Sequence, residues 1–403
     1  MLAIKPEETP RFGLAKPTVA WFPMVSAALA SVRGSGFPDD LTMRKALKTA
    51  AQRLCLPLPT KVYCFLVIGM VATSLAAVAT ANWLINPFGQ YSPNWLAPIV
   101  QDSRTEKVDL FERLAEPPQG LVLGSSRSMK LEPGYLQERT SIPFFNFAVN
   151  HGRPEDFLAI VRMYRDRFGC SPMTVIIGVD IASLNDIIPN DARLSSEPRL
   201  HAFADDTSSW SDQFEQWTQL FSYQQLSASL QSIGRTLRPS QKTDPVQTFD
   251  ADGLIQYRER QTQMAAGVYD FESALQFNER EFLSVFSRFA TVSKRRLSYL
   301  YETVRLCQAN GGQVYLFATV QHPRLREVLV SKTRCLEVEE EAIAELAEIA
   351  KDLGANFIDF GTVDTFAGDP ANFIDGIHPM ESNTRLMIDR LLPRFKESSY
   401  ALQ

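Results

Sequence analysis

The residues best suited to chemistry lie close to the C-terminus, at Asp375 and His378. An aspartate three residues before a histidine, at the start of an expected helix, can present both side chains to one point. A carboxylate held there orients the imidazole, and the oriented imidazole can take a proton from a hydroxyl group. The other interpretation, in which Asp375 only caps the following helix, stays open at this point.

A candidate hydroxyl group lies upstream, in the segment 121–127 with the sequence Leu-Val-Leu-Gly-Ser-Ser-Arg. Its apolar run predicts a strand, and Gly124 allows a sharp turn that exposes a serine. At the N-terminus of a following helix, backbone N–H groups would point at an oxyanion developing beside that serine. Ser125, Ser126 and Ser128 could instead only cap this helix. Together with Asp375 and His378, the segment favours a Ser/Asp/His hydrolase.

A further element ends the second apolar run, in residues 146–152 with the sequence Asn-Phe-Ala-Val-Asn-His-Gly. Asn150 or Gly152 could donate an N–H group to a substrate carbonyl at this point. An ordinary turn between a strand and a helix is the competing interpretation.

Alternating strands and helices must position these elements. Short apolar runs bounded by turn residues or charges predict strands buried on both faces of a parallel sheet, at 120–124, 144–149, 175–179, 314–320 and 356–360. Helices are expected at 154–167, 279–309, 337–353 and 381–395. The predicted fold class is therefore α/β with a central parallel sheet. All three chemical elements then follow strands, where open α/β sheets bind their ligands.

The alternation fails between residues 190 and 276, a stretch rich in Ser, Gln, Asp and Thr. We expect a helical and irregular insertion that covers the carboxyl edge of the sheet and shapes a substrate pocket. It should control specificity more than stability, so a short linker should replace it. A solvated excursion from the domain is the alternative.

With these motifs in this order, the chain resembles the SGNH hydrolases, the superfamily of GDSL-type esterases, over roughly residues 118–397. The family's Gly-Asp-Ser block is matched by Gly124-Ser125-Ser126, so the resemblance makes Ser126 the nucleophile. Its Asp-x-x-His block is matched by Asp375 and His378, which become the orienting carboxylate and the general base. The Gly-Ser-Ser-Arg version looks like a membrane-anchored bacterial branch, some of whose members are related to enzymes that acylate or deacylate cell-surface polysaccharides.

Other parts of the family pattern are matched less closely. The third block is often Gly-x-Asn-Asp, whereas the third predicted strand ends Gly178-Val179-Asp180 without that asparagine. The glycine of the second block is matched by Gly152, with Asn150 nearby as a further oxyanion donor. Ser125, Arg127 and Asp180 are expected to lie beside the bound substrate.

The resemblance implies a three-layer, flavodoxin-like domain that uses no cofactor and no metal. It implies a serine esterase or O-acyltransferase acting on O-acyl groups, most often acetyl, of an envelope or exported carbohydrate. The alternative is a catalytically weak or inactive SGNH-fold scaffold in a polysaccharide assembly or export complex. A metal-dependent hydrolase is disfavoured, because the sequence lacks the His and carboxylate clusters that such an enzyme needs.

Residues 62–81 carry no charge, and twenty such residues are enough to cross a bilayer core as a helix. We expect a transmembrane anchor at 62–85, followed by a connector at 86–117. No lysine or arginine occurs in the twenty residues after the span, whereas five basic residues precede it: Arg44, Lys45, Lys48, Arg53 and Lys61. This bias predicts a cytoplasmic N-terminus and a main domain outside the bacterial cytoplasmic membrane. A buried core helix and a signal peptide cleaved after Ala81 are the alternatives.

Composition sets further limits. The formal net charge of −5 and the lack of a basic stripe argue against nucleic acid as a partner. The five cysteines form no CxxC motif, so we expect free thiols rather than a zinc site, and no disulfide pairing can be deduced. The proline-containing tail 1–60 is expected to be largely disordered, with a short basic helix at 41–54.

Overall fold

The computed structural model of the chain describes residues 59–87, 91, 95–96, 103–188, 193–194, 197–204, 217–237 and 247–400. Side chains are described within these ranges except at residues 223–224, 235, 259 and 392–400. The predicted tail 1–60 lies outside the described residues apart from its last two positions, and the predicted basic helix 41–54 lies wholly outside them.

The chain divides into two compact units, Met1–Val71 and Ala72–Gln403. Helix α3, Thr60–Ile85, crosses the boundary between them. It is 26 residues long and apolar enough to span a membrane by length and composition. This helix contains the whole of the predicted anchor 62–85.

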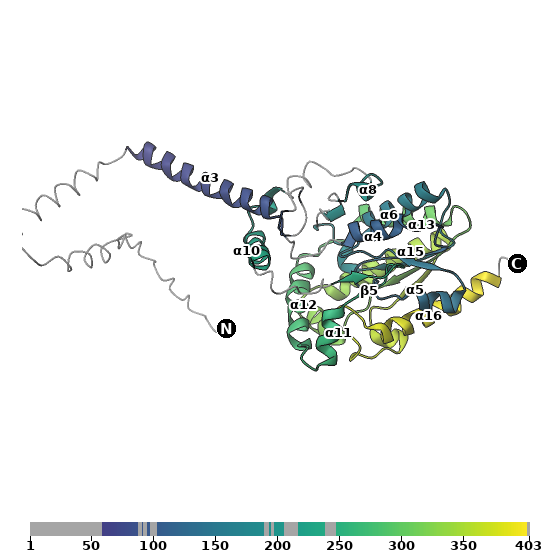
Figure 1. Cartoon of the computed structure of the whole chain (residues 1–403). Coiled ribbons are helices and arrows are strands. Elements are labelled where there is room, and N and C mark those ends of the chain that lie inside the picture. Colours follow the sequence, from purple (N-terminus) through teal and green to yellow (C-terminus); the bar gives the residue numbers. More distant parts are fainter. Residues whose placement is uncertain are drawn as a thin grey trace, which may run out of the picture. The chain divides into compact units, whose positions relative to one another are not determined.

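A five-stranded sheet forms the centre of the second unit (Figure 1), and its strands lie in the order β2-β1-β3-β6-β7. Its strands are β1 Gly120–Leu123, β2 Phe144–Asn146, β3 Thr174–Val179, β6 Gln313–Ala318 and β7 Asn356–Asp359. Every pairing is parallel, so the carboxyl ends of all five strands meet at one edge. The predicted α/β class, the parallel sheet and the positions of its strands are confirmed.

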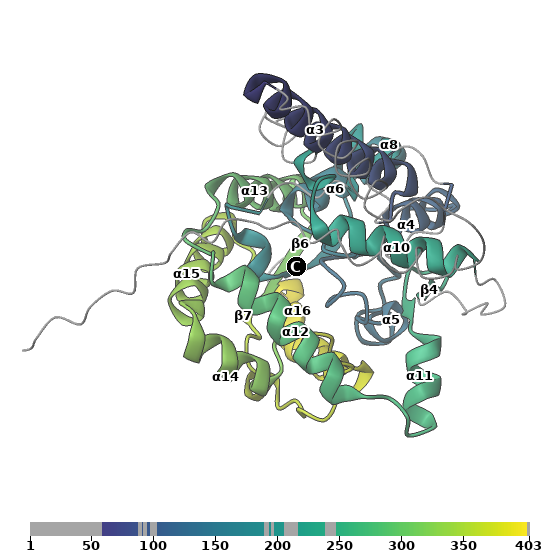
Figure 2. The same cartoon turned by 90° about the vertical axis from the view of Figure 1, so that its left-hand side faces the viewer.

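Helices cover both faces of this sheet, as the views in Figures 1 and 2 show. Side chains alternate along each strand, so Leu121 and Leu123 enter one core while Val122 enters the other. The first core is completed by α6 Pro154–Phe168, α13 Lys294–Gln308 and α15 Cys335–Leu353. The second is completed by α5 Pro133–Thr140 and α16 Glu381–Tyr400.

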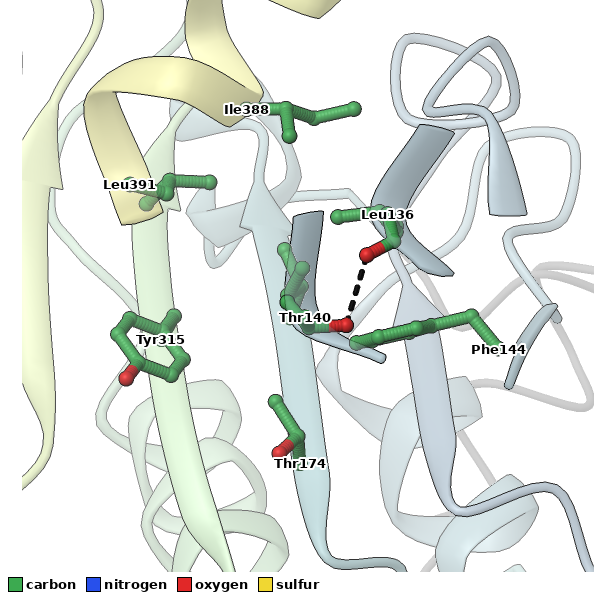
Figure 3. Close-up of a pocket in the computed structure, with 8 residues that line it drawn as sticks. Leu136, Thr140, Phe144, Thr174, Tyr315, Ile388 and Leu391 are labelled. Atoms are coloured by element: carbon green, nitrogen blue, oxygen red, sulfur yellow. Dashed lines mark hydrogen bonds between the residues drawn. The ribbon is translucent and has the colours of Figure 1, made fainter. Parts of the chain in front are cut away.

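A narrow apolar pocket lies between this second pair of helices and the sheet (Figure 3). It is lined by Leu136, Thr140, Phe144, Thr174, Ile176, Tyr315, Ile388 and Leu391. The Thr140 hydroxyl donates to the carbonyl of Leu136 at 2.7 Å, so it is satisfied within its own helix. Because Phe144 and Thr174 begin their strands, the pocket lies at the amino ends of the strands, away from the predicted site.

The single helix predicted at 279–309 is wrong. Two helices occupy this region, α12 Phe271–Phe286 and α13 Lys294–Gln308. The second helix begins at a cap, since the Ser293 hydroxyl accepts from the backbone N–H of Arg296. Residues 323–332 form a further helix that the pattern did not predict, α14 Pro323–Lys332.

Part of the predicted connector 86–117 is built into the domain. Residues 103–112 form α4, Ser103–Glu112, whose Val108 and Phe111 are fully buried. Its Arg104 pairs with Asp156 of α6 at 2.8 Å, with neither side chain exposed. A buried charge without its partner would be costly, so Arg104 must stay beside Asp156. The pair therefore holds α4 against α6.

The predicted insertion 190–276 is also partly built into the core. Its described elements are α8 Pro198–His201, α10 Tyr223–Leu237, β4 Thr248–Phe249, β5 Ile255–Gln256, α11 Arg258–Ala265 and the start of α12. Ile255 and Tyr257 are buried, and the backbone N–H of Asn146 donates to the carbonyl of Asp252 at 2.8 Å. Gly253 has a φ of 83°, and a Cβ there would lie 2.2 Å from the carbonyl oxygen of Asn146. The expectation that a short linker could replace this segment is therefore corrected.

Candidate active site

Ser126 lies in a tight series of turns directly after β1. Gly124 makes the first turn with a φ of 152°, and a Cβ there would lie 2.3 Å from the hydroxyl of Ser128. The helix expected at this point is absent from the described residues: the backbone N–H of Ser128 donates to the carbonyl of Ser125 at 2.9 Å, and α5 begins only at Pro133. These turns carry the serine hydroxyl to the carboxyl edge of the sheet.

Asp375 and His378 lie in a closed loop between β7 and α16. An isolated bridge pairs Phe373 with Pro379, and the backbone N–H of Ile374 donates to the carbonyl of His378 at 2.9 Å. Gly376 at the tip packs closely on the core, since a Cβ there would lie 2.8 Å from a methyl group of Leu275. The loop therefore has little freedom to change the direction of its two functional side chains.

The three predicted catalytic side chains form one continuous chain of hydrogen bonds. Ser126 Oγ lies 2.8 Å from His378 Nε2. On the other side of the ring, His378 Nδ1 lies 2.8 Å from Oδ2 and 3.0 Å from Oδ1 of Asp375. Residues separated by 252 positions in the sequence thus meet in the arrangement expected of a nucleophile, a base and an orienting carboxylate.

The ionised carboxylate of Asp375 selects the tautomer of the His378 imidazole. Burial alone would raise the pKa of this carboxyl, which is 5% exposed. His378 and the backbone N–H groups of Ile377 and His378 outweigh burial and hold the pKa well below its usual range. An ionised carboxylate accepts the Nδ1 proton, which leaves Nε2 as an acceptor for the hydroxyl of Ser126.

Residues from the predicted insertion surround this pair. The ring of Tyr257 lies 6.3 Å from the imidazole of His378, between ring centroids. Arg260 lies over the Tyr257 ring at 5.2 Å, and its Nη1 is 3.7 Å from Oδ2 of Asp375. The hydroxyl of Tyr269 donates to the carbonyl of Ile374 at 2.7 Å. The segment 257–269 thus supports the loop that carries the base.

Sequence reasoning missed Tyr257 and Arg260. The Tyr257 side chain is buried, and its hydroxyl has no hydrogen-bond partner among the described residues. Burial raises its pKa well above the usual range, so the phenol is neutral and can act as a donor. The available signal was weak, because nothing in the local pattern of this polar segment distinguishes the two residues from solvated ones.

The buried Arg127 and the partly buried Asp180 form a cluster beside the nucleophile, at the carboxyl ends of β1, β3 and β6. Arg127 Nη1 donates to the hydroxyl of Thr319 at 2.9 Å, and this hydroxyl donates to Oδ1 of Asp180 at 2.7 Å. Arg127 Nε lies 3.7 Å from the same carboxylate oxygen. Its Nη2 is buried and has no hydrogen-bond partner in the described part of the chain. Ser125 is buried as well, and its hydroxyl accepts from the backbone N–H of Arg127 at 3.2 Å.

The turn after β2 packs against the nucleophile loop. The backbone N–H of Val149 donates to the carbonyl of Gly124 at 3.0 Å, and a Cβ on Gly152 would lie 2.2 Å from that oxygen. The Gly152 amide, however, donates to the carbonyl of Val149 at 2.9 Å. Asn150 Nδ2 donates to the side chain of Gln247 at 3.0 Å. The geometry therefore does not support the Gly152 amide as an oxyanion donor unless it changes partner, whereas the Ser126 amide has no partner among the described residues.

The imidazole of His322 has different partners from that of His378. Its Nδ1 accepts from the backbone N–H of Arg324 at 3.2 Å and so caps α14. Its ring packs between Phe271 and Phe373, with centroid distances of 5.5 and 5.4 Å. Burial lowers the pKa of this imidazole. His322 therefore stabilises the fold near the site without a bond to Ser126.

Other chemistries find little support in the described residues. No group of three His, Cys, Asp or Glu side chains among them could hold a metal ion. The four cysteines at described positions, Cys64, Cys170, Cys307 and Cys335, are free thiols.

No protein-family model matches the sequence, and no curated protein is significantly similar to it.

Proposed function

We propose that this protein is a serine esterase or O-acyltransferase of the SGNH type. The observation that carries the proposal is the hydrogen-bond chain from Ser126 through His378 to Asp375. A parallel sheet in the order β2-β1-β3-β6-β7, with helices on both faces, suits the three-layer SGNH scaffold. The nucleophile at the end of β1 and the base after the last strand suit it as well.

Catalysis would proceed through an acyl-enzyme. Ser126 Oγ attacks the ester carbonyl carbon while His378 Nε2 takes the hydroxyl proton. The tetrahedral intermediate then collapses, the bond to the alcohol oxygen breaks, and His378 returns the proton to the leaving alcohol. Water or an acceptor hydroxyl attacks the acyl-enzyme in the second half, again with His378 as the base. The bond from the acyl carbon to Ser126 Oγ then breaks, and His378 returns the proton to that oxygen. The identity of this acceptor distinguishes hydrolysis from transfer.

The oxyanion formed in each half needs hydrogen-bond donors. The Ser126 amide is placed next to the developing charge and has no competing partner among the described residues. Removal of one oxyanion donor typically costs about 100- to 1000-fold in rate. A second donor, from Asn150 or Gly152, would require their present bonds to open when substrate binds.

The substrate class follows from the resemblance and from the apolar helix. We propose an O-acyl group, most often acetyl, on a carbohydrate of the cell envelope or on an exported carbohydrate, within an envelope biosynthesis complex. In this proposal α3 anchors the protein in the bacterial cytoplasmic membrane, with residues after Asn82 on the outer side. Alkaline phosphatase fused after Gln403 should then be active outside the cytoplasm, and a fusion active only inside would contradict this orientation.

A second candidate is a scaffold without catalytic activity in a polysaccharide assembly complex. The engaged amide of Gly152 and the missing asparagine after the third strand favour it. The two candidates differ in a simple assay. Full-length protein in detergent should hydrolyse 4-nitrophenyl acetate, and Ser126→Ala should abolish this activity while Ser125→Ala retains most of it. Equal background rates in all three proteins would favour the scaffold.

A further inference from the structure

On helix α10, Tyr223–Leu237, three polar side chains on one face are buried, whereas two leucines on another face are exposed. Gln225, Ser229 and Ser232 are 3%, 0% and 0% exposed, and their spacing of four and three residues places them on one face. Leu230 and Leu237 are 63% and 75% exposed. Surface helices of soluble proteins show the opposite pattern, with the apolar stripe directed at the core.

The buried polar face of α10 is bonded to the end of the candidate membrane helix. Asn82 of α3 is fully buried, and its Nδ2 donates to the carbonyl of Leu220 at 2.7 Å. The hydroxyl of Ser229 donates to Oδ1 of Asn82 at 2.8 Å. Since α3 ends at Ile85, these bonds hold α10 beside the last turn of the apolar helix.

The segment that leads into α10 extends the exposed apolar surface. Trp217 and Phe221 are 55% and 49% exposed. No charged residue occurs from Trp217 to Gly234. Tryptophan is enriched where a bilayer meets water, because one part of its ring system is apolar and its N–H needs a polar partner.

We propose that residues 217–237 form an interfacial element that lies on the outer leaflet of the membrane, with Leu230 and Leu237 among the acyl chains. This proposal rests on the anchoring by α3 proposed above. A span of about 20 residues ends close to Asn82, so the bonds from Asn82 set α10 at the depth of the headgroups. Interfacial helices bury their apolar face about 5–10 Å below that level. Continuity with the span favours lipid over a second copy of the chain as the occupant of this surface.

The test uses the full-length protein in liposomes of phosphatidylcholine and phosphatidylglycerol. A benzophenone amino acid replaces one exposed residue at a time, and lipid adducts are detected by mass spectrometry after illumination. Leu230 and Leu237 are the test positions. Val268 is the matched control, since it is an apolar side chain with 70% exposure on another part of the same unit, and Ile68 within α3 is 64% exposed and reports on the span. We expect lipid adducts at Leu230, Leu237 and Ile68 and none at Val268.

The other outcomes separate the two proposals. Adducts at Ile68 without adducts at Leu230 and Leu237 would overturn the interfacial element and leave the anchor intact. Covalent dimers at Leu230 in place of lipid adducts would show that a second copy covers this surface. Adducts of equal yield at Val268 would show non-specific contact and would also overturn the proposal. Absence of adducts at Ile68 would reject the membrane anchor itself, and the interfacial element with it, whatever the esterase assay gives. Each variant is compared with the unmodified protein by thermal unfolding, because these exposed positions should not alter it.

Discussion

Two histidines follow neighbouring strands of the sheet and are used in different ways. His322 comes after β6 and His378 comes after β7, and the two loops touch where the backbone N–H of His322 donates to the carbonyl of Gly376 at 3.0 Å. In His322 the Nδ1 atom accepts from a helix N-terminus. In His378 the Nδ1 atom faces a carboxylate, so its Nε2 is left to accept from Ser126. The partner of one ring nitrogen thus determines what the other nitrogen can do.

The difference between the loops is readable in local sequence. Asp375 precedes His378 by three residues and accepts from the backbone N–H groups of Ile377 and His378 at 2.9 Å, which closes the loop around the pair. Pro323 occupies the first position of α14, so His322 is the N-cap residue, and a side-chain acceptor is favoured there. Proximity to the site is therefore a poor guide to function here, and the partner of Nδ1 is a better one.

The largest effect should come from the loop of the base. His378→Ala or Ser126→Ala should lower kcat/KM for an acetyl ester by about 10⁴-fold or more, since members of a triad act as a unit. Ser125→Ala should cost much less, because that hydroxyl only accepts from a neighbouring amide. Steady-state kinetics of the purified proteins would test this. Full activity in Ser126→Ala with none in Ser125→Ala would show that the wrong serine is assigned.

Asp375→Asn should have the next largest effect. The neutral amide would favour the wrong tautomer of His378, and a loss of about 10³- to 10⁴-fold is expected. A rate within threefold of the parent would contradict the comparison of the two loops.

The same variant should change how stability depends on pH. The folded state lowers the pKa of Asp375, so the ionised carboxylate stabilises the fold above the unfolded-state pKa of about 4. This stabilisation is lost as pH falls through the lower, folded-state pKa. The free energy of unfolding, measured with denaturant, should therefore fall more steeply below about pH 4 for the parent than for Asp375→Asn. Parallel pH dependences would show that this carboxylate has an ordinary pKa in the folded protein.

Arg260→Gln should have a moderate effect, because Arg260 acts through Asp375 as a positioning residue. Its Nη1 atom is buried but lies 3.7 Å from Oδ2 of the carboxylate, beyond hydrogen-bond distance, so the interaction is weak. We expect a decrease in kcat of about tenfold or less, with the acidic limb of the pH–rate profile displaced and KM little changed. Arg260→Lys should recover part of the rate. Loss of thermal stability with an unaltered pH profile would indicate a merely structural role.

His322→Ala should have the smallest effect on rate and a clear effect on stability. Removal of the cap and of the ring between two phenylalanines should destabilise the fold by about 2 kcal/mol. The rate below the melting temperature should change by less than about threefold, because the ring makes no bond to Ser126. His322→Asn, which restores a capping acceptor, is the matched control and should recover much of the stability. A loss of rate as large as that of His378→Ala would remove the distinction between the two histidines.

Local sequence signals predicted much of the framework. The five strands are short apolar runs ended by turn residues, and such runs are readable one at a time. The helix at 154–168 begins with Pro154 and acids and ends at Gly169, whose φ is 66°. Local patterns placed the Ser125-Ser126 pair and the Asp375–His378 motif after strands, whereas the choice of Ser126 over Ser125 came from the resemblance to the SGNH hydrolases.

Contacts distant in sequence could not be predicted. Tyr257 and Arg260 reach the base only because the β4–β5 hairpin docks on Asn146 and Met129 through backbone hydrogen bonds, and residue types do not show which backbone groups will pair. The engaged amide of Gly152 depends on a turn whose hydrogen bond is invisible in residue types. The break between α12 and α13 was missed for a similar reason, since Ser293 becomes a cap through the docking of its backbone N–H on the carbonyl of Leu184 at 2.8 Å.

The most direct test of the proposed chemistry is whether Ser126 is an activated nucleophile. Full-length protein in detergent is treated with a fluorophosphonate probe, which forms a covalent bond only with an activated serine hydroxyl. The parent and Ser125→Ala should be labelled, with the modification on Ser126 by peptide mass spectrometry, and His378→Ala and Ser126→Ala should not. A folded parent that stays unlabelled, or labelling that persists in Ser126→Ala, would contradict the proposal that the bonded Ser126, His378 and Asp375 are a working catalytic triad.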